Sequence, residues 1–70
     1  MPLTLAPEDT ELKIVKILAD DKTKKHLENL GITISSTLTV LSHSGGSVIL
    51  IVKEGRLALD RSVATKILVA

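Results

Sequence analysis

The stretch His26-Leu27-Glu28-Asn29-Leu30-Gly31-Ile32 decides the fold of this chain, because it predicts where one short helix ends. Gly31 follows Leu27 and Leu30 at the point where a helix needs a residue that accepts φ > 0. The preceding segment therefore predicts a helix over residues 22–30, with Thr23, Leu27 and Leu30 on one stripe. So short a helix is not stable alone in water, and we expect the two leucines to dock on the rest of the chain. Asp20 or Asp21 is expected to cap its first turn.

Strands are predicted on both sides of this helix. In Glu11–Leu18, Leu12 and Ile14 share one face while Val15 and Ile17 share the other, which indicates a strand buried on both faces of a curled sheet. After the helix, strands are expected at residues 37–43, 47–53, 56–60 and 66–69. Glycine turns are expected at residues 44–46 and 54–55, and a single helical turn at residues 61–65.

The N-terminal residues 1–10 contain Pro2 and Pro7, which favour a short edge segment followed by a turn. The acidic residues nearby are interpreted as a solvated turn. Taken together, the segments predict one domain over residues 1–70. Its fold class is mainly β, a small five-stranded barrel with one short α-helix inserted after the first long strand.

Composition narrows the function classes. The chain has no cysteine, which excludes disulfides and thiolate metal sites, and it must rely on its 25 Ile, Leu and Val residues for a core. A net charge of +1 and the absence of Phe, Tyr and Trp argue against nucleic acid as a partner. No apolar run reaches the ~20 residues of a membrane span, and the N-terminus lacks the pattern of a secretion signal. We therefore expect a cytoplasmic protein that does not span a membrane.

Catalytic and metal-binding chemistry finds little support in the sequence. His26 and His43 are the only histidines, and their separation fits neither the i, i+3 nor the i, i+4 spacing of ligands on one helix face. They stay weak candidates for a ferrous or other divalent metal. The serines beside His43 point to alternate strand faces, which argues against a nucleophilic dyad. Gly45-Gly46-Ser47 lacks the lysine of a phosphate loop. We expect no catalytic residues, no bound cofactor and no enzyme activity.

The order of these segments resembles the FeoA family, small cytosolic companions of the ferrous-iron permease FeoB. The segments that carry the resemblance are Pro2–Leu5, Lys13–Ile17, Leu27–Ile32, Thr37–Val40, a glycine hairpin, Gly55–Leu59 and Ala64–Val69. The resemblance covers nearly the whole chain and implies an SH3-like barrel with a helical insertion. Many relatives carry Pro-Gly where this chain has Ile34-Ser35-Ser36, so the turn before the next strand is expected to be looser or shaped differently.

The resemblance implies a non-enzymatic accessory protein of bacterial ferrous-iron uptake. It would bind and modulate the cytosolic GTPase part of a FeoB-type permease. The alternative is a self-associating SH3-like module related to the C-terminal domain of metal-dependent transcriptional repressors, so a homo-oligomer is possible. On the helix, a charged face is the expected partner-binding surface, against the simpler interpretation of a solvated face. That surface consists of Lys22, Lys24, Lys25, His26, Glu28 and Asn29.

Overall fold

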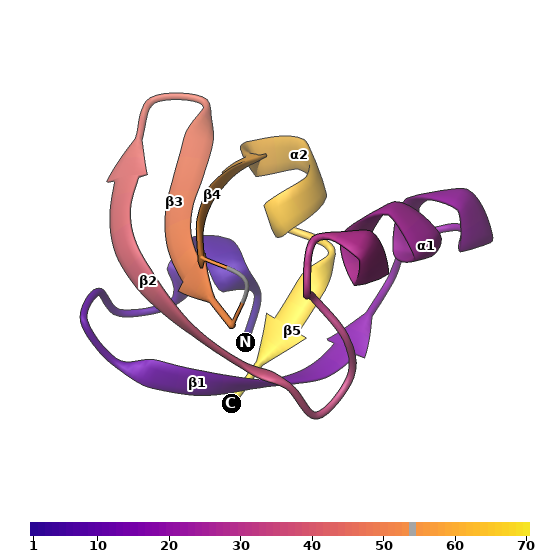
Figure 1. Cartoon of the computed structure of the whole chain (residues 1–70). Coiled ribbons are helices and arrows are strands. Elements are labelled where there is room, and N and C mark those ends of the chain that lie inside the picture. The colour runs from indigo at the N-terminus through magenta and orange to yellow at the C-terminus, as the bar shows by residue number, and fades with distance from the viewer. Residues whose placement is uncertain (54) are drawn as a thin grey trace.

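The computed structural model, which describes residues 1–53 and 55–70, contains five strands, two α-helices and one 3₁₀ turn. In chain order the elements are η1 (Leu3–Leu5), β1 (Glu11–Ile17), α1 (Asp21–Asn29), β2 (Thr37–Ser44), β3 (Ser47–Val52), β4 (Gly55–Asp60), α2 (Arg61–Ala64) and β5 (Ile67–Val69). The strands form one antiparallel sheet in the order β4-β3-β2-β1-β5, which curls around the core (Figure 1). The prediction of a mainly β, five-stranded fold with a helix after the first long strand is confirmed.

Two tight hairpins build the β2-β3-β4 part of the sheet. Ser44 pairs with Ser47 across the turn Gly45-Gly46, and Gly45 has φ 55°, as the predicted glycine turn requires. At the next hairpin Val52 pairs with Gly55. The prediction of a turn at Glu54-Gly55 includes Glu54, which lies outside the described residues. Val48, Leu50 and Val52 are buried, as the alternation along this strand predicts.

The expectation that β1 is buried on both faces is wrong. Leu12, Ile14 and Ile17 are buried, whereas Val15 is 46 % exposed. The pairing of β1 with β5 shifts register between Ile14 and Lys16, so Val15 is an extra residue in a β-bulge. A bulge reverses the alternation of side chains beyond it, which is why Ile14 and Ile17 face the same core although three positions separate them.

The N-terminal edge segment is only partly as predicted. Pro2 forms a bridge to Leu68 at the outer edge of β5, but the chain then turns into the 3₁₀ element η1. Because that turn rotates successive side chains, Leu3 is fully buried while Leu5 is 70 % exposed. The backbone N–H of Val69 donates to the carbonyl of Met1 at 2.8 Å, so this segment covers the outer edge of β5.

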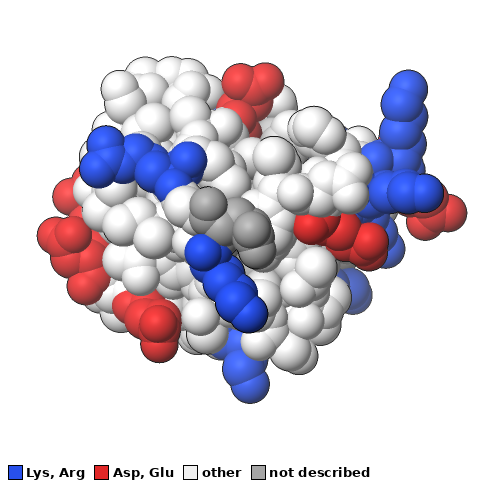
Figure 2. Space-filling view, in the orientation of Figure 1, with Lys and Arg blue, Asp and Glu red and all other residues white. Residues whose placement is uncertain are grey.

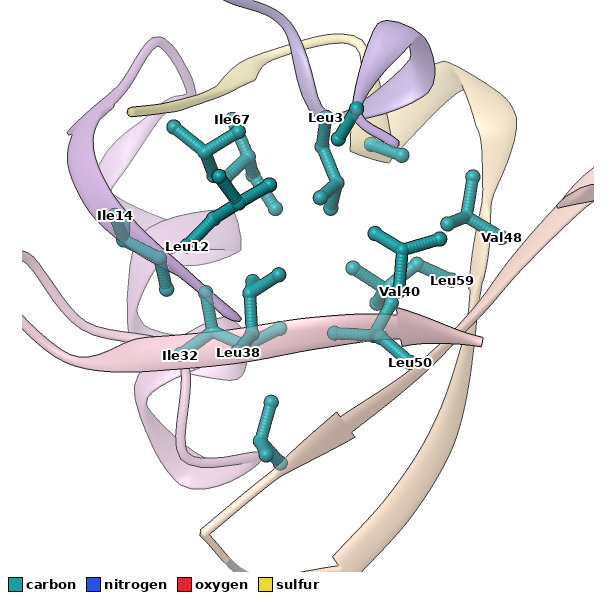
Figure 3. Close-up of a cluster of buried hydrophobic side chains, with 14 of the residues drawn as sticks. Leu3, Leu12, Ile14, Ile32, Leu38, Val40, Val48, Leu50, Leu59 and Ile67 are labelled. Carbon is teal, nitrogen blue, oxygen red and sulfur yellow. The ribbon is translucent and has the colours of Figure 1, made fainter. Parts of the chain in front are cut away.

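One aliphatic core fills the curl of the sheet (Figure 3). All the strands, α1, α2 and η1 contribute to it, and so do two loop residues. Its buried members are Leu3, Ala6, Leu12, Ile14, Ile17, Leu27, Ile32, Leu38, Val40, Val48, Leu50, Val52, Leu59, Ala64, Ile67 and Val69. Leu57, which shares the inner face of β4 with Leu59, is half-buried against the same core. The predicted helical turn after β4 is present as the single α-turn α2, whose Ala64 packs into the core.

The turn between α1 and β2, expected to be looser or shaped differently, is closed by hydrogen bonds of Ser36. The hydroxyl of Ser36 donates to the carbonyl of Thr33 at 2.6 Å and accepts from the N–H of Thr33 at 3.2 Å. The N–H of Ser36 also donates to that carbonyl at 3.1 Å, and Ser35, the third residue of this turn, has φ 75°. A type II turn requires positive φ at its third position, so a serine here occupies a conformation that glycine adopts without strain.

Candidate partner-binding surface

The start of α1 is fixed by Asp20. Its side chain accepts a hydrogen bond from the backbone N–H of Thr23 at 2.8 Å, which makes Asp20 the N-cap among the two predicted candidates. Hydrogen bonds from the side chain and the backbone of Thr23, together with the attraction of Lys66, hold the pKa of Asp20 below its ordinary value. Asp21 follows in the first turn, where a carboxylate complements the positive end of the helix dipole.

The end of α1 is fixed by a Schellman motif around Gly31. Ile32 N–H donates to the carbonyl of Leu27 at 2.9 Å, and Gly31 N–H donates to the carbonyl of Glu28 at 3.0 Å. Gly31 has φ 91°, as the sequence predicts for a glycine at this position. Leu27 and Ile32 are both buried in the core, so the motif joins the last helical turn to the interior.

The outer face of α1 carries the residues predicted to bind a partner. All six are exposed, and Figure 2 shows several blue basic side chains, with red acidic ones beside them, at the end of the molecule where α1 projects in Figure 1, while other basic side chains lie elsewhere on this face. The residues are Lys22, Lys24, Lys25, His26, Glu28 and Asn29. We call this surface the α1 face. The stripe on the opposite side of α1 docks through buried Leu27 and half-buried Thr23 and Leu30, in agreement with the predicted helical spacing.

Two grooves of about 190 Å³ each lie between α1 and β4, and Leu30 lines both. One continues from Leu30 and Asn29 to Arg56 and Leu57. The other groove is lined by His26 of α1 and Asp60 of β4, together with several leucines. The sequence analysis did not include β4 in the candidate surface. In the sequence, Arg56, Ala58 and Asp60 alternate with leucines along this strand. That alternation indicates that these three residues face outward, and all three are exposed in the structure.

The two histidines lie in different surroundings. His26 is exposed on the α1 face, whereas His43 lies at the end of β2 with its Nε2 3.1 Å from the carbonyl oxygen of Ala6. A carbonyl only accepts, so the Nε2 of His43 carries the proton in this contact. Within residues 1–53 and 55–70, no three His, Cys, Asp or Glu side chains come close enough to hold one metal ion.

No polar or charged side chain is buried among the residues that the structure describes. The titratable groups of the α1 face stand in water, where their charges attract a partner of opposite sign and act over about a Debye length. No helix in the described part of the chain is long and apolar enough to cross a membrane.

Comparison with known proteins identifies what this architecture is similar to. The sequence profile of the FeoA domain matches residues 1–70. A protein of Methanocaldococcus jannaschii named as an Fe(2+) transport protein A is 37 % identical over 68 residues, which cover 97 % of this chain and 83 % of that relative.

Solved structures agree with this match. The crystal structure of an iron uptake regulatory protein (FeoA) superposes with a TM-score of 0.86 at 28 % identity, covering 99 % of this chain and 92 % of the other. The solution structure of FeoA from Chlorobium tepidum has a TM-score of 0.88 at 21 % identity, covering 99 % of this chain and 68 % of the other. At that lower identity the second likeness shows the fold alone.

Proposed function

The chain belongs to the FeoA family of ferrous-iron transport accessory proteins, and on this basis we propose that it binds the cytosolic GTPase part of a FeoB-type permease through the α1 face. The observation that carries the proposal is a charged helix face whose position is fixed at both ends. Asp20 caps its start, and the bond from Ile32 to Leu27 closes its end. A face held this rigidly loses little conformational entropy when a partner docks on it.

The proposed effect on the partner is a shift between its nucleotide states. A binding protein changes an equilibrium only by its differential affinity for the two states. The α1 face would therefore bind the GTP-bound and GDP-bound forms of the GTPase part unequally and favour one of them. In this proposal the chain is not an enzyme, and it acts in the cytoplasm, where the GTPase part of the permease lies.

Three lysines on the α1 face predict a partner surface that is acidic. Lys22, Lys24 and Lys25 lie within one turn, and Glu28 is the acidic member of the face. Opposite charges steer encounter and specify orientation. The affinity is therefore expected to fall as ionic strength rises, because these side chains are exposed and screened by salt.

The experiment measures binding calorimetrically between this chain and the cytosolic part of the permease, loaded in turn with GDP and with a non-hydrolysable GTP analogue. The variant K24E/K25E is expected to weaken binding about tenfold or more. The control K13E/K16E makes the same change in net charge on exposed positions of β1 and is expected to bind as the parent does. Absence of binding to both nucleotide states by a folded chain would refute the proposal.

No resident metal is needed for this function. We propose that His26 and His43 do not bind ferrous or other divalent ions. An NMR titration of the imidazole signals with Mn²⁺ or Fe²⁺ tests this point, since a bound paramagnetic ion broadens nearby signals strongly. Saturable broadening of either histidine at micromolar metal would contradict it.

A further inference from the structure

We propose that β4 pairs with the β4 strand of a second copy of this chain, edge to edge and antiparallel, in a register centred on Ala58. This edge adjoins the α1 face but consists of other residues, so the inference goes beyond the proposed function. A strand at the edge of a sheet offers unpaired N–H and C=O groups that another strand can satisfy. In the sheet order, β4 is one of the two outermost strands, and the N-terminal segment covers the other, β5.

The pairing of β4 with β3 defines which backbone groups are free. Val52 pairs with Gly55, only three positions further along the chain, so the two form a hydrogen-bonded pair, and every second pair beyond them is also hydrogen-bonded. The bond from Arg61 N–H to the carbonyl of Gly46, at 2.9 Å, continues the same alternation. The intervening residues of β4 are therefore the ones whose backbone groups point away from β3. They are Arg56, Ala58 and Asp60, and all three are exposed.

A two-fold axis through Ala58 satisfies these groups reciprocally. The N–H and C=O of Ala58 meet those of Ala58 in the second copy, and the N–H of Asp60 meets the C=O of Arg56 in both directions. Asp60 is the N-cap of α2, the position whose carbonyl accepts the first bond of a helix, so its carbonyl is not counted here. This register forms four backbone hydrogen bonds between the two copies.

The charges on the edge select the same register. Antiparallel pairing centred on Ala58 places Arg56 directly opposite Asp60 of the other copy, twice, and such cross-strand neighbours interact directly. In-register parallel pairing would instead place like charges side by side. The small side chain at the two-fold axis lets the two strands approach closely. A strand with a positive and a negative residue placed symmetrically about an alanine is complementary to itself.

This edge lines the two grooves between α1 and β4, so a second strand paired with it would lie next to α1. Because only three residues of each strand take part, we expect a weak dimer in rapid exchange, unlike the long edge pairings that lead to aggregation.

Sedimentation velocity over a concentration series up to about 1 mM tests the proposal. The parent chain is expected to associate with concentration. The variants R56D and D60R each place like charges opposite one another in a homodimer, and each is expected to weaken association about tenfold or more. An equimolar mixture of R56D and D60R restores unlike pairs and is expected to associate again, as is the double variant R56D/D60R. K13D makes the same change in charge as R56D, but on β1, and serves as the control for that variant.

Three results of these experiments would overturn the proposal. A monomeric parent chain at 1 mM would overturn the proposal, as would a dimer that R56D and D60R leave unchanged. Failure of the mixture to associate, with both variants folded by their amide spectra, would also overturn it. Failure of this proposal is distinguishable from failure of the proposed function, because K24E/K25E and R56D/D60R change different elements and are read by different measurements.

Discussion

Ile32 donates its backbone N–H to the carbonyl of Leu27 at 2.9 Å, and both side chains lie in the core. This bond closes α1 and at the same time returns the chain to the barrel. The direction in which α1 projects, and therefore where its charged face stands, depends on the single residue between them that adopts φ 91°, Gly31.

Gly31→Ala is expected to lower the free energy of unfolding by about 1–2 kcal/mol, because a Cβ is disfavoured at positive φ. Urea denaturation measures the change. Gly46→Ala is the matched control, since Gly46 does not have positive φ and an added Cβ there meets no atom within 4 Å. Equal effects of the two substitutions would contradict the role assigned to Gly31.

Ser35→Gly is expected to stabilise the chain by about 0.5–1 kcal/mol, because it relieves the strain of a serine at φ 75°. Thermal unfolding is a suitable measurement. Ser44→Gly serves for comparison, since Ser44 lies in β2 without positive φ and glycine weakens a strand. A loss of stability in Ser35→Gly would show that the turn does not hold the strained conformation.

Leu27→Ala is expected to destabilise the fold by about 3 kcal/mol, because Leu27 is 1 % exposed and its removal leaves a cavity where α1 docks. Chemical denaturation quantifies the loss. Leu5→Ala removes the same atoms from a side chain that is 70 % exposed, and we expect less than about 0.5 kcal/mol there. A small effect at Leu27 would mean that α1 is not anchored through this residue.

Acid should loosen the start of α1 before it unfolds the barrel. The pKa of Asp20 is lowered in the folded chain, so its contribution to stability is fully present above the unfolded-state pKa, at about pH 4. That contribution is lost as pH falls through the folded-state value. Amide exchange at Thr23 and Lys24 is expected to increase below that point. Asp20→Asn keeps a capping oxygen that does not titrate, and retention of the acid response in this variant would contradict the assignment.

Local patterns predicted most of the fold, and tertiary contacts determined the exceptions. Val48, Leu50 and Val52 alternate in a strand whose register a two-residue turn fixes, so the pattern was sufficient. Val15 was assigned to a buried face because a bulge depends on how β1 meets β5, which the pattern of one strand does not contain. Leu3 is buried and Leu5 exposed because a 3₁₀ turn forms where this segment meets β5.

The candidate surface, too, was predictable from the sequence only in part. The α1 face follows from helical spacing and from the caps at Asp20 and Gly31, all of which are local. Its neighbour β4 lies more than twenty residues further along the chain, and only the folded barrel brings Arg56 and Asp60 beside α1. The exposed charges on alternate positions of β4 were visible in the sequence, but their nearness to the helix was not.

The most direct test of the account is an NMR titration of the isotope-labelled chain with the cytosolic GTPase part of the permease, in the GDP-bound and GTP-analogue-bound states. We predict that amide signals of α1, from Asp21 to Asn29, shift or broaden, and that the two nucleotide states differ in the concentration needed. Perturbation confined to other elements, or an unchanged spectrum in both states, would contradict the central claim that the α1 face binds the partner.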